Sequence, residues 1–280
     1  MRFVRTLCVL LTLGAVPVHA APDPMEQVQQ GYEHAQKHDY ATAIKIVTPI
    51  AETGHGMAQY FLATLYEGGF GYKPAKLGEA RVWLERAAEG GLMQAQASLG
   101  DKYYDGVGLP QDFAQAMKWY KLSAAQNFAP PQNTLGEMYE LGRGVPEDPR
   151  IAFSYYIKAA ENGLALAQVN VGRMYATGSG VSKDNEMAID YFLMAARQKS
   201  AAAAIWLGSA YETGSGVKKD LVQAYMWTLL ANKHADLRQS PADFSSGLGA
   251  ILDNLRYNMT PEQVAQAEKL AAEWKPEQKK

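Results

Sequence analysis

The chain has 280 residues, of which 48% are hydrophobic and 20% are charged, and its formal net charge is −2 at pH 7. These proportions are typical of a folded protein and exclude a largely disordered one. The nearly balanced charge also argues against a nucleic-acid-binding protein, which would normally carry a basic stripe. The single cysteine, Cys8, lies close to the N-terminus, so the rest of the chain cannot depend on disulfide bonds.

Residues 1–20 have the pattern of a signal peptide. Arg2 and Arg5 flank the start of an apolar run at 7–18, which is shorter than the ~20 residues needed to cross a bilayer. Small residues at the end of this run favour cleavage after Ala20. We therefore expect a periplasmic or secreted protein with no integral membrane segment after cleavage. The alternative is an N-terminal anchor that is never removed.

Residues 21–57 are expected to form N-terminal capping helices, because apolar residues recur there with helical spacing around Pro49. Within this stretch His34 and His38 stand at i and i+4, the spacing of a two-histidine metal site. No third ligand is evident in the sequence, so no metal site is predicted. The two histidines are interpreted as surface or half-buried residues of the cap.

Residues 58–238 contain five copies of one pattern about 36 residues long. Each copy carries a Leu-Gly pair or a close variant, and a tyrosine three residues after it; these are Tyr66, Tyr103, Tyr139, Tyr175 and Tyr211. Self-similarity at this period is typical of stacked helix pairs, each of which is too small to bury its own apolar face. The copies are expected at 58–94, 95–130, 131–166, 167–202 and 203–238.

Each copy is read as a helix, a loop and a second helix. In the second copy the first helix should run from about 94 to 104 and end at Gly106, because glycine tolerates the left-handed conformation. Asp112 should cap the second helix by accepting hydrogen bonds from its free amides. Later copies repeat this residue as Asp148, Asp184 and Asp220. The second helix of each copy carries an alanine and, three residues later, an aromatic residue; in the second copy these are Ala116 and Trp119. The aromatic ring is expected to fill the space that the small residue leaves open on the next helix.

The third copy shows the full pattern as Leu135-Gly136, Tyr139, Gly142, Gly144-Val145, Asp148, Ala152, Tyr155 and Ala159-Ala160. This pattern resembles the Sel1-like repeat family, a branch of the tetratricopeptide-type α-solenoids. The resemblance covers about residues 58–235 and implies an all-α solenoid of antiparallel helix pairs in a right-handed superhelix. The first copy departs from the pattern at residues 70–74 and lacks the capping aspartate, so an irregular loop is expected there.

Residues 239–280 are expected to form C-terminal capping helices, which a solenoid needs in order to stay soluble. Thr260 and Gln263 have the spacing of a capping box, with Pro261 at the first helical position. The face that this helix would bury consists of Val264, Ala267, Leu270, Ala271 and Trp274.

The sequence predicts no catalytic residue and no cofactor. Ser215 and Lys218 match the S-x-x-K string of penicillin-recognising enzymes, but they fall in a repeat loop, and no K-T-G string accompanies them. They are therefore interpreted as loop variation. The aromatic residues recur at fixed spacing in every copy, which is typical of a core and not of a sugar-binding platform.

The resemblance to tetratricopeptide-like solenoids implies a concave groove lined by the first helix of each copy. By register, the candidate partner-binding residues are Tyr60, Glu67, Asp101, Tyr104, Asp105, Asn133, Glu137, Glu140, Arg173 and Glu212. Acids outnumber bases among them, which favours a basic or amine-bearing partner segment. The alternative is that these are ordinary solvated helix positions. Lysine at Asp101, Glu137 and Glu140 is expected to weaken binding and to leave the fold intact.

Together these features predict an exported, non-enzymatic scaffold or adaptor that binds a peptide or protein partner in its groove. The alternative function is an envelope enzyme or carbohydrate-binding factor that acts on cell-wall material, in the manner of a β-lactamase. A convergent cluster of a nucleophile, a base and an orienting group would favour the enzyme, and the sequence offers none.

Overall fold

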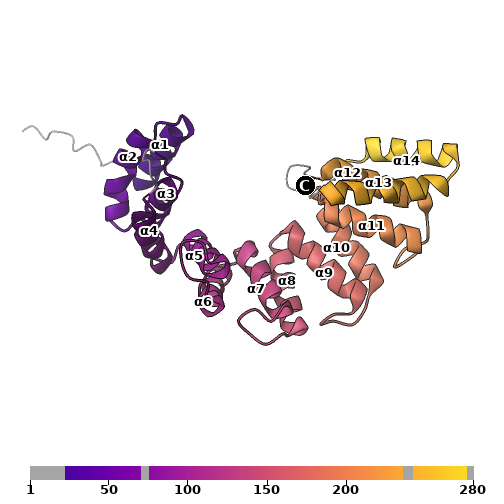
Figure 1. Cartoon of the computed structure of the whole chain (residues 1–280), viewed down its shortest axis with the longest axis horizontal. Helices are drawn as coiled ribbons and strands as arrows, with labels where there is room; N and C mark the ends of the chain where they lie inside the picture. The colour runs from indigo at the N-terminus through magenta and orange to yellow at the C-terminus, as the bar shows by residue number, and fades with distance from the viewer. Residues whose placement is uncertain (1–22, 71–75, 236–241, 276–280) are drawn as a thin grey trace, which may run out of the picture. The chain divides into compact units, whose positions relative to one another are not determined.

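The computed structural model describes residues 23–70, 76–235 and 242–275, with the side chains of 242–246 excepted. Within these ranges every regular element is a helix, which confirms the predicted all-α class (Figure 1). The helices are α1 (Pro24–Gln36), α2 (Tyr40–Glu52), α3 (Gly56–Glu67), α4 (Leu77–Glu89), α5 (Met93–Asp105), α6 (Phe113–Ala124), α7 (Ala129–Glu140), α8 (Pro149–Glu161), α9 (Ala165–Thr177), α10 (Asn185–Arg197), α11 (Ala201–Thr213), α12 (Leu221–His234), α13 (Ala242–Tyr257) and α14 (Pro261–Glu273).

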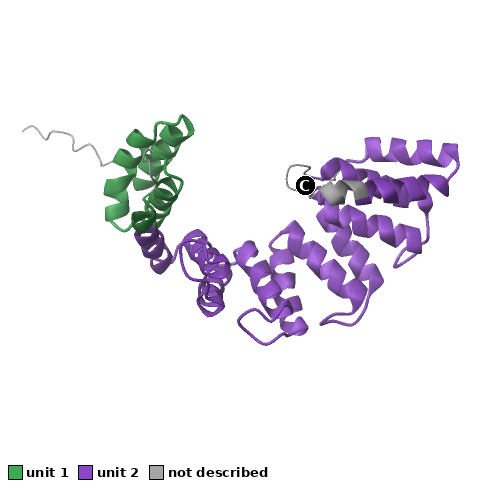
Figure 2. Ribbon diagram, in the orientation of Figure 1, with its two compact units in different colours: residues 1–80 green, residues 81–280 purple. Residues whose placement is uncertain are grey.

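The chain divides into two compact units, unit 1 at residues 1–80 and unit 2 at residues 81–280 (Figure 2). In unit 1, α1 packs against α2 and α2 against α3. In unit 2, every helix from α5 to α12 packs against the next one along the chain. This is the stacked arrangement of helix pairs that the repeat predicts, because each pair covers the apolar face of its neighbour.

The predicted helix ends are confirmed. The Asp112 carboxylate accepts hydrogen bonds from the backbone amides of Ala114 and Gln115, at 2.9 and 3.0 Å, and so caps α6. The equivalent aspartates cap α8, α10 and α12 in the same way; they are Asp148, Asp184 and Asp220. Gly106 ends α5 with φ of 73°, in the left-handed region that the prediction requires.

A buried glutamine of each early repeat bonds to the preceding helix. Gln96 donates its side-chain amide to the Ala88 carbonyl at 3.1 Å, and Gln126 donates to the Gln96 side-chain oxygen at 2.9 Å. The same bond to the helix before is made by Gln59, Gln132 and Gln168, to the carbonyls of Ala51, Ala124 and Ala160. These carbonyls lie at helix ends and each also accepts a hydrogen bond from a backbone amide of the following turn, so the glutamine is a second donor that ties its own helix to the one before. They explain why glutamine recurs in the sequence pattern.

The glycine of each Leu-Gly pair allows a close approach, as predicted, and in the second copy the ring that approaches it belongs to Tyr120, a residue that the sequence pattern did not single out. A Cβ atom on Gly100 would lie 2.6 Å from the ring of Tyr120, which is fully buried, whereas Trp119 is half-buried. On a helix, the residue at i+4 lies about 40° from Ala116, and the residue at i+3 lies about 60° away. The ring that faces Gly100 is therefore that of Tyr120, one residue after Trp119. Gly136 with Tyr156 and Gly172 with Phe192 repeat the contact.

The C-terminal helices share the core of the last repeat. The capping box predicted at Thr260 and Gln263 is present, and α14 buries Ala267 and Ala271 against α12. None of the described helices is long and apolar enough to cross a membrane. The predicted signal peptide and most of the predicted irregular loop of the first copy lie outside the described residues.

Candidate functional site: the first-helix face

The first helices of the repeats in unit 2 are α5, α7, α9 and α11, and they carry eight of the ten candidate residues. We call the surface formed by these candidates the first-helix face; its members in unit 2 are Asp101, Tyr104, Asp105, Asn133, Glu137, Glu140, Arg173 and Glu212. The other two candidates, Tyr60 and Glu67, lie on α3 in unit 1.

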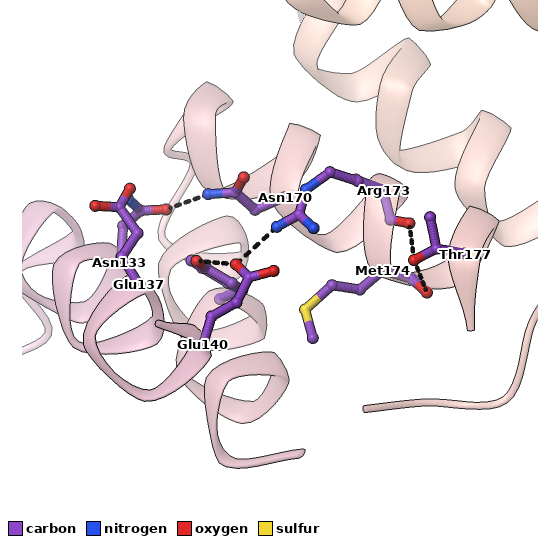
Figure 3. A network of polar contacts seen from close by, with 8 residues as sticks. Asn133, Glu137, Glu140, Asn170, Arg173, Met174 and Thr177 are labelled. Atoms are coloured by element: carbon purple, nitrogen blue, oxygen red, sulfur yellow. Dashed lines mark hydrogen bonds and ion pairs between the residues drawn. The ribbon is translucent and has the colours of Figure 1, made fainter. Parts of the chain in front are cut away.

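The centre of the first-helix face is an ion pair between neighbouring repeats (Figure 3). Arg173 on α9 donates from Nη2 to Oε2 of Glu140 on α7, at 2.8 Å. The same oxygen accepts a hydrogen bond from the hydroxyl of Tyr156, also at 2.8 Å. Tyr156 is the buried ring that packs on Gly136, so Glu140 ties the core of its own repeat to the surface of the next one.

A chain of amide groups lies beside this ion pair (Figure 3). Asn170 donates to the side-chain oxygen of Asn133 at 3.0 Å, and Asn133 in turn donates to Glu137 at 2.8 Å. Only 3% of Asn133 is exposed. Asn133 therefore links α7 to α9 and presents almost no surface to a partner.

A second contact between repeats involves a residue that the sequence reading missed. Arg143 donates a hydrogen bond to the hydroxyl of Tyr104 and lies over its ring, 5.4 Å from the centroid. Arg143 stands between two loop glycines, and the equivalent residues of the other loops are uncharged: Val107, Ser179 and Ser215. That difference was the signal in the sequence. It was missed because only helical positions were carried over by register.

The acids of the first-helix face have different electrostatic environments. Burial raises the pKa of Asp101, although the Tyr120 hydroxyl donates to its carboxylate at 2.8 Å. Burial likewise raises the pKa of Glu137. Burial would raise the pKa of Glu140 too, but the hydrogen bonds from Arg173 and Tyr156 outweigh it and hold that pKa below its usual value. Glu140 is thus the acid that the fold itself stabilises in its charged form.

These contacts revise the expectation that lysine at Asp101, Glu137 and Glu140 would leave the fold intact. Replacing Asp101 or Glu140 removes the acceptor of a buried tyrosine hydroxyl, and a lysine at 140 would face Arg173. Asp105 is exposed and Glu212 is half-buried, and within the described residues neither side chain makes a hydrogen bond or an ion pair. Asp105 and Glu212 are therefore the acids whose replacement tests binding without disturbing the contacts between repeats.

In unit 1, Tyr60 lines an apolar hollow of about 360 Å³ between α1 and α3. The other lining residues are Met25, Val28, Gln29, Tyr32, Met57, Phe61 and Thr64. Glu67 is exposed near the end of α3 and does not line this hollow. The hollow carries no charged side chain, so it lacks the acidic character expected of the groove.

The residues considered for other chemistry have local partners. His34 contacts the Asp39 carboxylate at 3.0 Å, and His38 contacts the hydroxyl of Tyr40 at 2.8 Å. Within the described ranges, no group of three or more His, Cys, Asp or Glu residues could hold a metal ion. The Ser215 hydroxyl lies 2.8 Å from that of Thr213.

Comparison with known proteins gives the following similarities. A family model described as Sel1 repeat matches residues 56–92, 94–128, 132–164, 165–200 and 201–236. A solved structure of a protective antigen present in uropathogenic Escherichia coli strains, which displays an SLR fold, is 30% identical over 89% of this chain and 52% of its own, with a TM-score of 0.77. A Sel1 repeat protein from Oxalobacter formigenes is 27% identical over 87% of this chain and 98% of its own, with a TM-score of 0.74. This chain thus spans about half the length of the first structure. No curated protein matches the sequence.

Proposed function

Because the chain belongs to the Sel1 repeat family, we propose that it is a scaffold whose first-helix face in unit 2 binds a basic segment of a protein partner. Sel1 repeat proteins are typically scaffolds for protein interactions, and their fold is generally non-catalytic. The observation that carries the proposal for this chain is the excess of acids on that face. The acids are Asp101, Asp105, Glu137, Glu140 and Glu212, and the bases beside them are Lys102, Arg143 and Arg173.

Arg143 and Arg173 are both engaged by neighbouring repeats. Arg173 is paired with Glu140, and Arg143 is bonded to Tyr104. The negative charge of Asp105 and Glu212 is not offset by such a pair within the described residues. A surface on which charges of one sign are in excess attracts segments of the opposite sign, which supports a lysine- or arginine-rich partner.

Charge reversal at Asp105 and Glu212 tests the proposal. The double variant D105K/E212K should bind acetyl-hexalysine amide about tenfold more weakly than the unaltered chain, because each reversal replaces an attraction with a repulsion. Isothermal titration calorimetry at low salt measures the affinity, and added salt should reduce the difference.

The matched control is E161K/D190K, which makes the same change in net charge on exposed residues of the second helices α8 and α10. It should bind the peptide nearly as well as the unaltered chain. Equal weakening in both variants would mean that only net charge matters, and unchanged binding by D105K/E212K would refute the acidic face.

The proposed scaffold acts outside the cytoplasm, with a signal peptide at residues 1–20. The support is the arrangement of Arg2 and Arg5 around the start of the apolar run at 7–18, together with the small residues before Ala21. Expression of the full chain in a Gram-negative bacterium should yield a periplasmic or secreted protein whose N-terminus is Ala21. N-terminal sequencing of fractionated cells checks this, and an intact Met1 in the membrane fraction would indicate a retained anchor instead.

A further inference from the structure

Three equivalent positions recur at each junction between consecutive repeats of unit 2. They are the residue after the repeat tyrosine, the residue after the Leu-Gly pair of the next repeat, and the residue between the loop glycines of that next repeat. At the successive junctions these are Tyr104, Glu137 and Arg143; then Glu140, Arg173 and Ser179; then Ala176, Ser209 and Ser215. Large bonded side chains stand at the first two junctions. All three residues of the last trio are small.

The last junction holds a hollow of about 170 Å³. Ala176, Ser209 and Ser215 all line it. One repeat earlier, the positions of Ala176 and Ser209 are taken by Glu140 and Arg173, and their ion pair occupies the corresponding space. The hollow therefore results from the short side chains at this junction and not from a break in the helix stacking, which continues from α9 through α12.

The size and the walls of the hollow suit one planar ring. Its volume is close to the ~150 Å³ of an engineered apolar cavity that accepts benzene. One wall is formed by Phe192 and Trp206, whose rings are stacked with centroids 5.4 Å apart and planes 7° apart, and Ile189 adds an aliphatic surface. An aromatic side chain that enters would find the ring contacts that aromatic groups prefer.

Three hydroxyl groups of the hollow, those of Thr177, Thr213 and Ser215, are committed as donors and remain able to accept. The Thr213 hydroxyl donates its only proton to the Ser209 carbonyl at 2.9 Å. In the 2.8 Å hydrogen bond between the Thr213 and Ser215 hydroxyls, Ser215 is therefore the donor. The lone pairs of the Ser215 oxygen can then accept a hydrogen bond from an entering group. Thr177 also lines the hollow, and its hydroxyl donates a hydrogen bond to the Arg173 carbonyl.

Two donors complete the lining. Lys183 and Asn185 both line the hollow, and the described part of the chain shows no hydrogen bond or ion pair for either side chain. A group that suits this site must fill a ring-sized space, donate one hydrogen bond to a hydroxyl oxygen and accept one from an amide or ammonium group. A phenol has all three properties, because its O–H both donates and accepts.

We infer that this hollow receives a tyrosine side chain of the partner segment. The inference rests on the proposed scaffold function, because the tyrosine belongs to the protein partner. It adds a site that makes the scaffold selective for partner segments with a tyrosine. The ring lies against Phe192 and Trp206, and the phenol hydroxyl donates to Ser215. In many interfaces a few buried residues, often aromatic ones, supply most of the binding energy. A tyrosine ring in this hollow would play that part beside the acidic face.

An uncharged probe tests the hollow independently of the acidic face. N-acetyl-tyrosine amide should bind the unaltered chain, the phenylalanine analogue should bind about fivefold more weakly because it leaves the hydroxyl acceptor unused, and the alanine analogue should not bind measurably. Saturation-transfer and chemical-shift titrations by NMR give the three affinities. Equal affinity for all three analogues, or no binding of any, would overturn the inference.

Filling the hollow tests its location. The variant A176E/S209R recreates the pair that Glu140 and Arg173 form one repeat earlier, and it should bind the tyrosine probe at least tenfold more weakly. The control I151E/S154R adds the same two residue types at exposed positions of α8 and should bind the probe normally. Retained binding by A176E/S209R, with the helical circular dichroism of the unaltered chain, would place the probe elsewhere and refute the inference.

A second variant keeps the test valid if A176E/S209R fails to fold. Ser215→Ala is an exposed loop change, and it should abolish the preference for tyrosine over phenylalanine while leaving the phenylalanine affinity unchanged. An undiminished tyrosine preference in that variant would refute the hydroxyl contact. Failure of the acidic face would show separately, as unchanged hexalysine binding by D105K/E212K, because the tyrosine probe carries no charge.

Discussion

Replacing Gly136 with valine is expected to lower the free energy of unfolding by about 2–3 kcal/mol, because overpacking a well-filled core carries a cost of this order. A Cβ atom at this position would lie 2.6 Å from the ring of Tyr156, which is completely buried between α7 and α8. The ring has no room to withdraw, so the two helices must separate. Urea denaturation followed by circular dichroism measures the loss.

The matched control is the same substitution at Gly249, in the interior of α13. A Cβ atom there would meet nothing within 4 Å, so valine should change the stability by about 0.5 kcal/mol or less. Both variants make the same change in helix propensity, and only the close contact differs. Equal stability of the two variants would show that the glycine is not needed for the approach of the second helix.

Replacing Glu140 with leucine is expected to lower the free energy of unfolding by about 2–3 kcal/mol, because it leaves both Arg173 and the buried Tyr156 hydroxyl without an acceptor. The pair is mostly shielded from solvent, with 20% of the Glu140 side chain and 29% of the Arg173 side chain exposed. Glu147→Leu, on the exposed loop before α8, serves as the control and should change the stability by less than about 0.5 kcal/mol.

A double-mutant cycle separates the ion pair from other effects. Arg173→Leu should cost less in the Glu140→Leu background than in the unaltered chain, because its partner is already absent. Additive losses would mean that the two side chains do not interact.

The pH dependence of the same site has a defined sign. The folded-state pKa of Glu140 lies below its usual value of 4.5, so its charged form stabilises the fold above that value, and the contribution is lost as pH falls through the folded-state pKa. Glu140→Gln keeps an oxygen for Tyr156 and removes the charge. Its stability deficit should therefore be present at pH 7 and disappear in acid. A deficit that stays the same as the pH is lowered from 7 into the acid range would contradict the ion-pair explanation.

One side chain thus serves both the proposed partner surface and the packing of the repeats. Glu140 contributes negative charge to the first-helix face, and it also holds the buried ring of α8 and the guanidinium of α9. Changes at such residues affect binding and stability together. This is why Asp105 and Glu212, which lack such contacts within the described ranges, are the sharper probes of binding.

The sequence alone determined the fold class, the stacking of helix pairs and most helix ends. A period of 36 residues leaves little choice of architecture, because each helix pair must bury its apolar face on a copy of itself. The caps at Asp112, Gly106 and Thr260 were readable because capping depends on residues within one turn of the helix end.

Only the tertiary structure decided which side chains meet across the repeats. The register placed Glu140 and Arg173 on one surface, but a spacing of 33 residues does not reveal that they pair or that Tyr156 shares the same oxygen. The same holds for Arg143, which reaches back from a loop to Tyr104, and for the hollow that Ala176, Ser209 and Ser215 leave open. The physical reason is that periodicity fixes the direction of a side chain from its own helix, whereas pairing and empty space depend on the lengths of all the neighbouring side chains.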